Sequence, residues 1–386
     1  MHSGRPTQGG TAVGEHPRPE LGTQLEQLER LVMTESPSGD VDLVRRCAAA
    51  VGDLVREVLG ERPQELEVEG QPHLLLRSGA ARPVLLLAHL DTVWPAGTTA
   101  HWPFAVDGDW ATGPGVFDMK AGLVQGLHAV QLSGATDVDL LVTSDEEIGS
   151  PTSRALIEQQ AARARAVLVL EPSIDGAPKT SRKGVSIYRL RVRGRASHAG
   201  LEPEAGVNAL VELAAQVTTI HGLQDAVAGT TVTPTVATAG TTTNTVPATA
   251  EVSVDVRAWS AEEQTRVDSA LRALTPRLPG ASLELLGGVN RPPLEAVASA
   301  PLMRLAARCA AELGIDLPPG RAVGGGSDGN FTAALGVPTL DGIGAVGHGA
   351  HAAGERAFVP ALTDRAALVA RLLQELTTNG IVEVRT

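Results

Sequence analysis

Three short apolar segments of this sequence each lead into a residue that can bind a metal ion. His89 follows PVLLLA, the acidic run Asp145, Glu146 and Glu147 follows DLLVTS, and Glu171 follows AVLVL. Consecutive acids at the end of a buried segment are costly unless a cation neutralises them. Histidine nitrogen and carboxylate oxygen are both ligands that zinc accepts. The pattern therefore predicts a metal site at the ends of buried strands.

Two Gly-rich segments add further ligand-type residues. Asp118 lies in GPGVFDMK, and His348 and His351 lie in GHGAHAAGE. Asp91 follows His89 by two residues, and alternate side chains of an extended segment point the same way. We therefore expect Asp91 to hydrogen-bond the far ring nitrogen of His89 and to fix its tautomer.

Each of these features has a simpler explanation when it is taken alone. A strand-end histidine can have an acidic neighbour by chance, Gly-Pro-Gly most often marks a surface turn, and an acidic run is commonly a solvated loop. Together they are more specific, because successive buried strands end in ligand-type residues. Sites that hold two metal ions about 3.5–4 Å apart use such ligands for hydrolysis. Such a site also needs one carboxylate that bridges the ions and another that acts as a base without binding.

The elements that must position these residues follow from the apolar pattern. Residues 83–88, 139–143 and 166–170 are continuous apolar runs, which are typical of buried strands. Helical spacing of apolar residues occurs within 21–59 and over 121–132. Buried strands between helices favour an α/β fold with a mostly parallel sheet covered on both faces. Open sheets of this kind place ligands at the carboxyl ends of their strands.

A different pattern begins near residue 182. Residues 185–192 alternate apolar and polar side chains, as a half-exposed antiparallel strand does. Two Thr/Val-rich strand candidates and two helical segments follow before Arg291-Pro292-Pro293. We therefore expect a smaller α+β domain inserted into the main one. The predicted boundaries are a disordered tail at 1–20, a discontinuous catalytic domain at 21–181 and 293–386, and the inserted domain at 182–292.

Composition narrows the class of protein. Asp and Glu (44) outnumber Lys and Arg (32), and aromatic residues make up 2% of the chain, so nucleic acid is not an expected partner. Cys47 and Cys309 belong to no paired motif, which favours a reducing, cytoplasmic location. No apolar run approaches the roughly 20 residues that a membrane span needs, so no membrane partner is expected.

Several stretches of the sequence resemble the zinc aminoacylase, acetylornithine deacetylase and glutamate carboxypeptidase family of metallopeptidases. They are HLDTV, GPGVFDMKAG, TSDEEIGS, LEPS, ASHAG, TNTVPATAEVSVDVR, GGGSDGN and GAHAAGE. They run in family order and cover most of the chain, and RASHAGLEPEAGVNALVE is particularly similar to the glutamate carboxypeptidase branch. The resemblance implies a zinc-peptidase domain with an inserted dimerisation (lid) domain.

The resemblance also implies a cofactor of two Zn²⁺ per chain, for which Co²⁺ or Mn²⁺ can substitute. The implied ligands are His89, Asp118 and Glu171 for one ion, and Asp118, Glu147 and His351 for the other, with Asp118 as the bridge. Glu146 is implied as the general base and acid, and Asp91 as a catalytic residue beside the ligands. The family context and the downstream Glu355 favour His351 over His348. The peptide after the bridging aspartate is implied to be cis.

Substrate-binding roles are implied outside the ligand set. His198, in the inserted domain, would be an oxyanion donor to the partner subunit's active site, although a surface-turn histidine stays open. Arg257 would hold the substrate carboxylate, because a guanidinium matches a carboxylate with two parallel hydrogen bonds. Asn244 would bind the substrate from a neighbouring loop. Gly326 and Ser327 would offer backbone N–H groups to the same carboxylate, with a flexible turn as the alternative.

These roles predict a co-catalytic two-zinc hydrolase that cleaves an amide bond next to a free carboxylate, as a glutamate-carboxypeptidase-like exopeptidase does. An N-acyl amino acid deacylase or a dipeptidase shares the zinc site and stays open as an alternative. An inactive binding protein on the same scaffold is disfavoured because the base Glu146 is present. The expected partners are a small peptide or N-acyl amino acid substrate and a second copy of the chain, since exposed strand edges need pairing.

Overall fold

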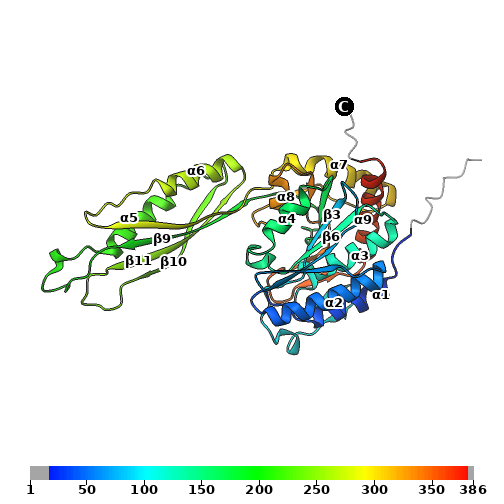
Figure 1. Cartoon of the computed structure of the whole chain (residues 1–386), viewed down its shortest axis with the longest axis horizontal. Helices are drawn as coiled ribbons and strands as arrows, with labels where there is room; N and C mark the ends of the chain where they lie inside the picture. The colour runs from blue at the N-terminus through cyan, green and yellow to red at the C-terminus, as the bar shows by residue number, and fades with distance from the viewer. Residues whose placement is uncertain (1–16, 381–386) are drawn as a thin grey trace, which may run out of the picture.

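The computed structural model describes residues 17–380, which form two lobes joined by a narrow connection (Figure 1). The larger lobe, called the main domain here, has helices on both sides of a sheet. The smaller lobe, called the inserted domain, spans residues 184–291 and extends away from it. Most of the tail predicted at 1–20 lies outside the described residues. Its last part is described, with Arg18 paired to Asp364 at 2.6 Å.

A six-stranded sheet in the order β1-β2-β6-β3-β7-β14 forms the centre of the main domain. β3 pairs in parallel with β6 and β7, and β14 pairs in parallel with β7. The β1–β2 hairpin joins β6 in the antiparallel sense. The carboxyl ends of β6, β3 and β7 therefore meet at one edge. The strands span Gln64–Val68 (β1), Gln71–Leu76 (β2), Val84–His89 (β3), Val138–Thr143 (β6), Ala166–Val169 (β7) and Thr339–Leu340 (β14).

Both faces of this sheet are buried. Val84, Leu86 and Ala88 of β3 belong to one apolar core, whereas Leu85 and Leu87 belong to a second core on the opposite face. Because side chains alternate along a strand, a segment buried on both faces must be apolar throughout. The α/β fold with a mostly parallel sheet between helices, predicted from these apolar runs, is confirmed.

Two helical layers cover the sheet. α1, α2, α3 and α9 lie on one face, and α4 and α8 lie on the other (Figure 1). α3 is the central helix of the first layer and is buried throughout 121–129, which explains its apolar sequence. The helices of this domain span Leu21–Met33 (α1), Val41–Leu59 (α2), Ala121–Ser133 (α3), Arg154–Ala161 (α4), Ala296–Leu313 (α7), Gly329–Ala334 (α8) and Ala361–Thr378 (α9).

The inserted domain is a four-stranded antiparallel sheet in the order β10-β11-β9-β12, with α5 and α6 on one face (Figure 1). Alternate residues such as Leu190 and Val252 form a core with these helices, whereas Ile187 lies on the open face. β10 is an edge strand, and most of its residues are exposed. The elements span Gly184–Arg193 (β9), Ala209–His221 (α5), Thr231–Ala239 (β10), Thr249–Ala258 (β11), Ala261–Arg272 (α6) and Ser282–Arg291 (β12).

The chain crosses between the two domains twice, at 182–184 and at 291–294. Arg182 and Leu294 pair at this point, with N–H···O distances of 2.9 and 3.0 Å. The incoming segment is β8 (Lys179–Arg182), which pairs in parallel with β13 (Arg321–Val323) in the main domain. The two crossings therefore form one hydrogen-bonded hinge.

Smaller elements complete the main domain near the strand ends. A second four-stranded sheet has the order β15-β16-β5-β4. It places the loop that contains His351 beside the π-helical turn Val116–Lys120. The strands span Ala105–Asp107 (β4), Trp110–Thr112 (β5), Gly347–His348 (β15) and Arg356–Phe358 (β16). Among the described residues, no helix is both long and apolar enough to cross a membrane.

The sequence patterns predicted β3, β6, β7, β9, β10 and β11 and missed the other ten described strands, among them β1, β2 and β12. β1 and β2 carry many polar side chains at the sheet edge, so neither is a continuous apolar run. β12 contains Gly287 and Gly288, and Gly287 has a φ of 86°. Glycine in a strand normally signals a turn or a bulge. The pairing of β12 with β9 overrides this local signal.

Candidate metal centre

The ends of three neighbouring strands bring four of the predicted residues to one edge of the main sheet. His89 is the last residue of β3, Glu146 and Glu147 start a short 3-10 helix after β6, and Glu171 follows β7. Because β6, β3 and β7 are parallel, these residues emerge together. His89, Glu146 and Glu171 are all buried.

Asp118 lies between two histidines. Its Oδ1 is 3.3 Å from His89 Nε2, and its Oδ2 is 3.4 Å from His351 Nε2. The loop that carries it contains a cis peptide between Asp118 and Met119, as the family resemblance implied. With one carboxylate oxygen facing each histidine, Asp118 is oriented as a bridge between two positions.

A glutamate completes each side of this bridge. Glu171 Oε1 is 3.5 Å from His89 Nε2, and Glu147 Oε2 is 2.9 Å from His351 Nε2. His351 has a φ of 61°, a conformation that non-glycine residues rarely adopt. Its side chain is half exposed, whereas His89 is fully buried. His351 thus lies at the solvent-facing side of the cluster, while the side chains of Glu147 and Asp118 are only 6% and 11% exposed.

The residues of this cluster fit metal binding. Within the described chain, the buried His89 Nε2 and Asp118 Oδ1 have no hydrogen-bond partner, which is uncommon for buried polar atoms. Ligand atoms of His89, Asp118 and Glu147 lie within 4.8 Å of one another, as do those of His89, Glu146 and Glu171. Carboxylates this close together need a cation to offset their charge. The mixture of imidazole and carboxylate suits zinc.

The adjacent residues Glu146 and Glu147 contact different partners. Glu147 contacts His351, whereas Glu146 Oε1 accepts a hydrogen bond from Arg291 Nη2 at 3.0 Å. An oxygen that a guanidinium already holds is less available to a metal ion. Glu147 thus belongs to the group with His89 and Asp118, and Glu146 to the group with His89 and Glu171.

Asp91 contacts His89 through its main-chain carbonyl, and not through its carboxylate as predicted from the sequence. His89 Nδ1 donates to the main-chain carbonyl of Asp91 at 3.0 Å, and the carboxylate is farther away at 3.4 Å. The carbonyl can only accept, so this bond leaves Nε2 free to bind a metal. The Asp91 carboxylate instead accepts the backbone N–H groups of Glu146 and Glu147, both at 3.2 Å, and the Ser38 hydroxyl at 2.6 Å.

Glu355 holds the Asp118 loop in place. This fully buried carboxylate accepts backbone N–H groups from Gly115, Phe117 and Asp118 at 2.8–3.1 Å. It also accepts the indole N–H of Trp94 at 2.7 Å. Because Glu355 lies on the same loop as His351, it joins the segments that carry Asp118 and His351.

The charges of the cluster place protons on several ligand atoms. Hydrogen bonds to Asp118 and Glu147 raise the pKa of His351 to about 10. Burial raises the pKa of Glu147 to about 7, and the Asp118 charge adds to this while the bond to His351 opposes it. Burial disfavours protonated His89, but the nearby carboxylates of Asp118, Asp91 and Glu171 outweigh this and raise its pKa well above the usual range.

We expect metal binding to release protons and to strengthen as pH rises. Metal ligands must be deprotonated, whereas in the metal-free protein the pKa of His351 is about 10 and that of Glu147 is about 7. Protons are therefore products of binding, and apparent affinity should rise about tenfold per pH unit for each proton released. Calorimetric zinc titrations in buffers of different ionisation enthalpy will count these protons, and we expect about one or more at pH 7.

His348 provides the matched control for this measurement. It is half exposed and lies 4.0 Å from Asp175, outside the cluster. His351→Ala should reduce the number of protons released, whereas His348→Ala should leave it unchanged. Equal proton release by wild type and both variants would contradict the assignment of His351 as a ligand.

The predicted residues of the inserted domain lie apart from this cluster. His198 and Asn244 are exposed neighbours in two loops, where the Ala199 N–H donates to the Asn244 carbonyl at 2.9 Å. These loops lie beyond the end of β9 that is farther from the hinge. Arg257 is near the hinge, opposite Val185, and its guanidinium pairs with Asp255 at 2.8 Å.

The Gly-rich loop, residues 324–327, lies at the hinge. Several of its polar groups are already hydrogen-bonded to other residues of the chain. Ser327 is buried, and its hydroxyl donates to Asp341 Oδ2 at 2.5 Å. The carbonyls of Gly325 and Gly326 accept hydrogen bonds from Arg182 at 3.3 and 3.2 Å. The loop thus holds an arginine through its carbonyl groups, a role that the sequence did not indicate.

Sequence reasoning also missed two buried arginines next to the cluster. Arg182 Nη2 donates to Glu171 Oε2 at 2.9 Å, and Arg291 contacts Glu146. In the sequence both residues served only to mark the predicted domain boundaries. Their position at the boundaries was the available signal, and it identifies no partner.

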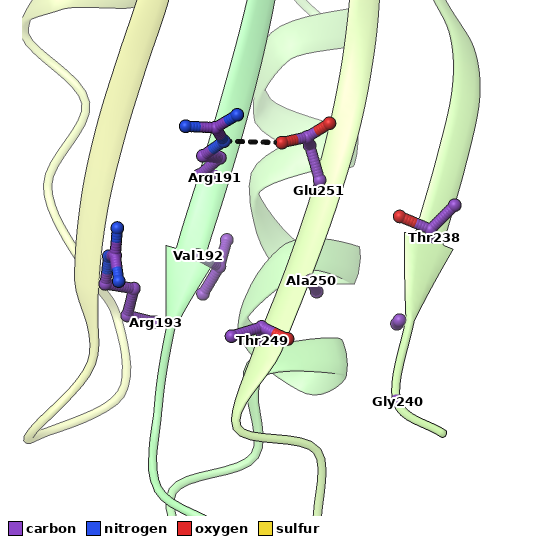
Figure 2. Close-up of a pocket in the computed structure, with 9 residues that line it drawn as sticks. Arg191, Val192, Arg193, Thr238, Gly240, Thr249, Ala250 and Glu251 are labelled. Atoms are coloured by element: carbon purple, nitrogen blue, oxygen red, sulfur yellow. Dashed lines mark hydrogen bonds and ion pairs between the residues drawn. The ribbon is translucent and has the colours of Figure 1, made fainter. Parts of the chain in front are cut away.

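A hollow on the inserted domain is distinct from the metal centre. Figure 2 shows it on the open face of the sheet, lined by β9, β10 and β11 and the residues next to them. Arg191 and Glu251 form an ion pair of 2.6 Å at its wall. None of the metal-centre ligands lines this hollow.

The fold and the histidine–carboxylate cluster together define a metallopeptidase with a two-domain architecture. The chain belongs to peptidase family M20/M25/M40, whose model matches residues 85–375. The family predicted from the sequence motifs is confirmed.

Relatives of known structure or name agree with this placement. The chain is 32% identical to carboxypeptidase G2 of Pseudomonas sp. over 371 residues, which cover 91% of this chain and 89% of that protein. It is 33% identical to N-acetyl-L-citrulline deacetylase of Xanthomonas campestris, over 49% of this chain and 52% of that one. Aminopeptidase PepT of Bacillus cereus has the same fold, with a TM-score of 0.72, 20% identity and coverage of 92% and 99% of the two chains.

Proposed function

We propose that this metallopeptidase is a co-catalytic two-zinc hydrolase that cleaves an amide bond next to a free carboxylate and releases a C-terminal amino acid. The observation that carries the proposal is the position of Asp118, whose two oxygens face His89 and His351 at 3.3 and 3.4 Å. The similarity to carboxypeptidase G2 over nearly the whole chain supports the carboxypeptidase reaction.

The proposed ligand sets follow the contacts of the cluster. His89, Asp118 and Glu171 would hold one zinc ion, and Asp118, Glu147 and His351 would hold the other. When bound, such a pair polarises a scissile carbonyl and lowers the pKa of a coordinated water to about 7.

Glu146 is the proposed general base and acid. Burial raises its pKa well above the usual range, the charges of Glu171 and Asp328 add to this, and Arg291 opposes it. In the reaction, Glu146 would take a proton from the attacking water and return it to the leaving amine, so that one water is consumed per amide bond. Its position beside the ligands, held by Arg291, supports this role.

Recognition of the substrate carboxylate is proposed for Arg257 and the Gly-rich loop. Arg257 lies near the hinge of its own chain, where domain closure would bring it toward the metal centre. Its pairing with Asp255 shows that the guanidinium already has the geometry to hold a carboxylate at two points. The Ser327 N–H donates to Asn330 Oδ1 at 2.9 Å, which leaves Gly326 as the proposed contact from this loop. Asn244 lies beside the His198 loop, so we propose that it contacts the substrate together with His198, across the homodimer.

The substrate proposal predicts strong dependence on a free α-carboxylate. Among N-acyl and N-aminoacyl derivatives of glutamate, aspartate, ornithine and neutral amino acids, we expect the glutamate compounds to give the highest kcat/KM. The matched control is the same substrate with its carboxylate amidated, which should lose about 10²-fold or more because a charge-binding site is left unpaired. Equal rates with the amide would contradict the proposal. A preference for N-acetylornithine would favour the deacylase alternative, which the deacetylase relative supports.

We propose that His198 acts in the active site of the partner subunit of a homodimer. β9 has 10 residues, so at about 3.3 Å per residue His198 lies roughly 30 Å from the hinge. A histidine at that distance is poorly placed to serve its own metal centre. The exposed edge strand β10 offers a surface for pairing with a second copy.

Subunit exchange tests this arrangement. We expect a mixture of inactive Glu146→Gln and His198→Ala chains to recover up to roughly a quarter of wild-type activity, because half of the randomly formed dimers are mixed and each has one intact site. The control mixture, Glu146→Gln with Asp118→Ala, should stay inactive since both changes lie in the main domain. No recovery after demonstrated exchange would show that His198 does not act across the dimer.

A further inference from the structure

Each crossing between the two domains carries one buried arginine. Arg182 ends β8 on the way into the inserted domain, and Arg291 ends β12 on the way out. Their exposed fractions are only 3% and 6%. A buried guanidinium is tolerated when its N–H groups are paired, so the partners of these residues indicate what they stabilise.

Arg182 fixes the orientation of Glu171. Its Nη2 donates to Glu171 Oε2 at 2.9 Å, and Nε and Nη2 donate to the two oxygens of Asp341 at 2.8 and 2.9 Å. Lys179 Nζ also lies 3.5 Å from Glu171 Oε2. These contacts occupy Oε2 and leave Oε1 directed toward His89 in the metal centre. Glu171 therefore presents one defined oxygen to the cluster.

Arg291 fixes Glu146 in a comparable way. Its Nη2 donates to the Glu146 carbonyl at 3.1 Å and to Glu146 Oε1 at 3.0 Å, so it holds both the backbone and the side chain. Ser150 Oγ and Asp328 Oδ1 lie 2.7 and 3.1 Å from the same nitrogen, whose two hydrogens are shared among these acceptors. The guanidinium also lies over the ring of Phe331, with its carbon 5.3 Å from the ring centroid.

The Gly-rich loop joins the two crossings. Asn330 Nδ2 donates to the Lys183 carbonyl at 3.2 Å and to the Pro292 carbonyl at 2.7 Å. The Arg182–Leu294 backbone pair joins the same two segments directly. The hinge is thus one connected unit that contacts two acidic residues of the site from opposite crossings.

We propose that Arg182 and Arg291 are positioning residues, through which the hinge holds the metal ligand Glu171 and the base Glu146 in their working orientations. The inference rests on the proposed function, because it takes Glu171 as a ligand and Glu146 as the base. A merely structural hinge would lose stability when either arginine is replaced, and it would lose nothing specific at the site.

Arg182→Met tests the ligand half of the proposal. The methionine keeps much of the side-chain volume and removes the 2.9 Å hydrogen bond to Glu171, so that only the longer contact from Lys179 at 3.5 Å remains. Zinc affinity, measured by competition with a chelator of known strength, should fall about 10–100-fold for one of the two ions, as loss of a ligand's supporting partner typically does. If Arg182→Met binds both zinc ions with wild-type affinity, Arg182 does not position Glu171.

Arg291→Met tests the base half. Zinc affinity should stay at the wild-type value, while kcat falls about 10²-fold, which is the scale expected when a reacting group is displaced by about 1 Å. KM should change by less than about threefold, because no substrate contact is removed. A rise in KM at constant kcat would overturn the positioning role and indicate direct substrate binding instead.

Arg272→Met is the matched control for both variants. Arg272 is half exposed in α6 of the inserted domain and pairs with Asp268 at 2.9 Å, so its replacement should change neither zinc affinity nor kcat. If a methionine variant fails to fold, the Arg→Lys variant is measured with the same expected direction. If wild-type protein hydrolyses no substrate of the panel, the proposed function fails, and the zinc affinity of Arg182→Met still decides the inference.

Discussion

Glu146→Gln should keep its metal ions and lose most of its turnover. The glutamine has nearly the same shape and can still contact Arg291, but it cannot accept a proton from water. Loss of a general base typically reduces kcat by about 10²–10⁴-fold. We expect zinc content, measured by elemental analysis of the purified protein, to equal that of wild type, so the loss will be one of proton transfer and not of metal binding.

Glu147→Gln is the matched control, because it makes the same chemical change one residue away. Glu147 Oε2 lies 2.9 Å from His351 Nε2, whereas Glu146 Oε1 is held by Arg291. The Glu147 variant should therefore lose zinc as well as activity. If zinc is lost from the Glu146 variant and retained by the Glu147 variant, the two roles are reversed.

Asp118→Ala should remove both metal ions and abolish hydrolysis. The two oxygens of Asp118 face His89 and His351, so one substitution takes a ligand from each proposed position. Zinc content should fall from about two ions per chain toward none. Elemental analysis after dialysis against metal-free buffer will measure this directly.

The control for this variant is Asp107→Ala, which removes an exposed aspartate of β4. It should retain full zinc content and wild-type activity. Full occupancy in the Asp118 variant would refute the bridging assignment, and loss of a single ion would show that the second position has another anchor. Circular dichroism will confirm that both variants are folded.

The sequence predicted the parts of the fold that depend on local patterns. Buried strands β3, β6 and β7 were evident as short apolar runs, and their ends supplied His89, Glu146 and Glu171. The parallel pairing of these strands follows from their burial on both faces, and it explains why ligands far apart in sequence meet. Polar or glycine-containing strands such as β12 were missed because their pairing, and not their composition, stabilises them.

Contacts between distant segments could not be predicted from the pattern. Arg291 reaches Glu146 across 145 residues, and Arg182 reaches Asp341 across 159. No periodicity specifies such a partner. Asp91 gives a second example. The spacing in the sequence correctly placed Asp91 beside His89, but it could not show that the Asp91 main-chain carbonyl is closer to the ring than the carboxylate is.

Glu355 has a consequence for the order in which the protein is made. Its carboxylate anchors the backbone of the Asp118 loop from 237 residues farther along the chain, and His351 comes from the same late segment. A ribosome must therefore synthesise the chain from Asp118 through Glu355 before both halves of the metal centre can assemble. We therefore expect tight capture of metal only after His351 and Glu355 have been added to the chain.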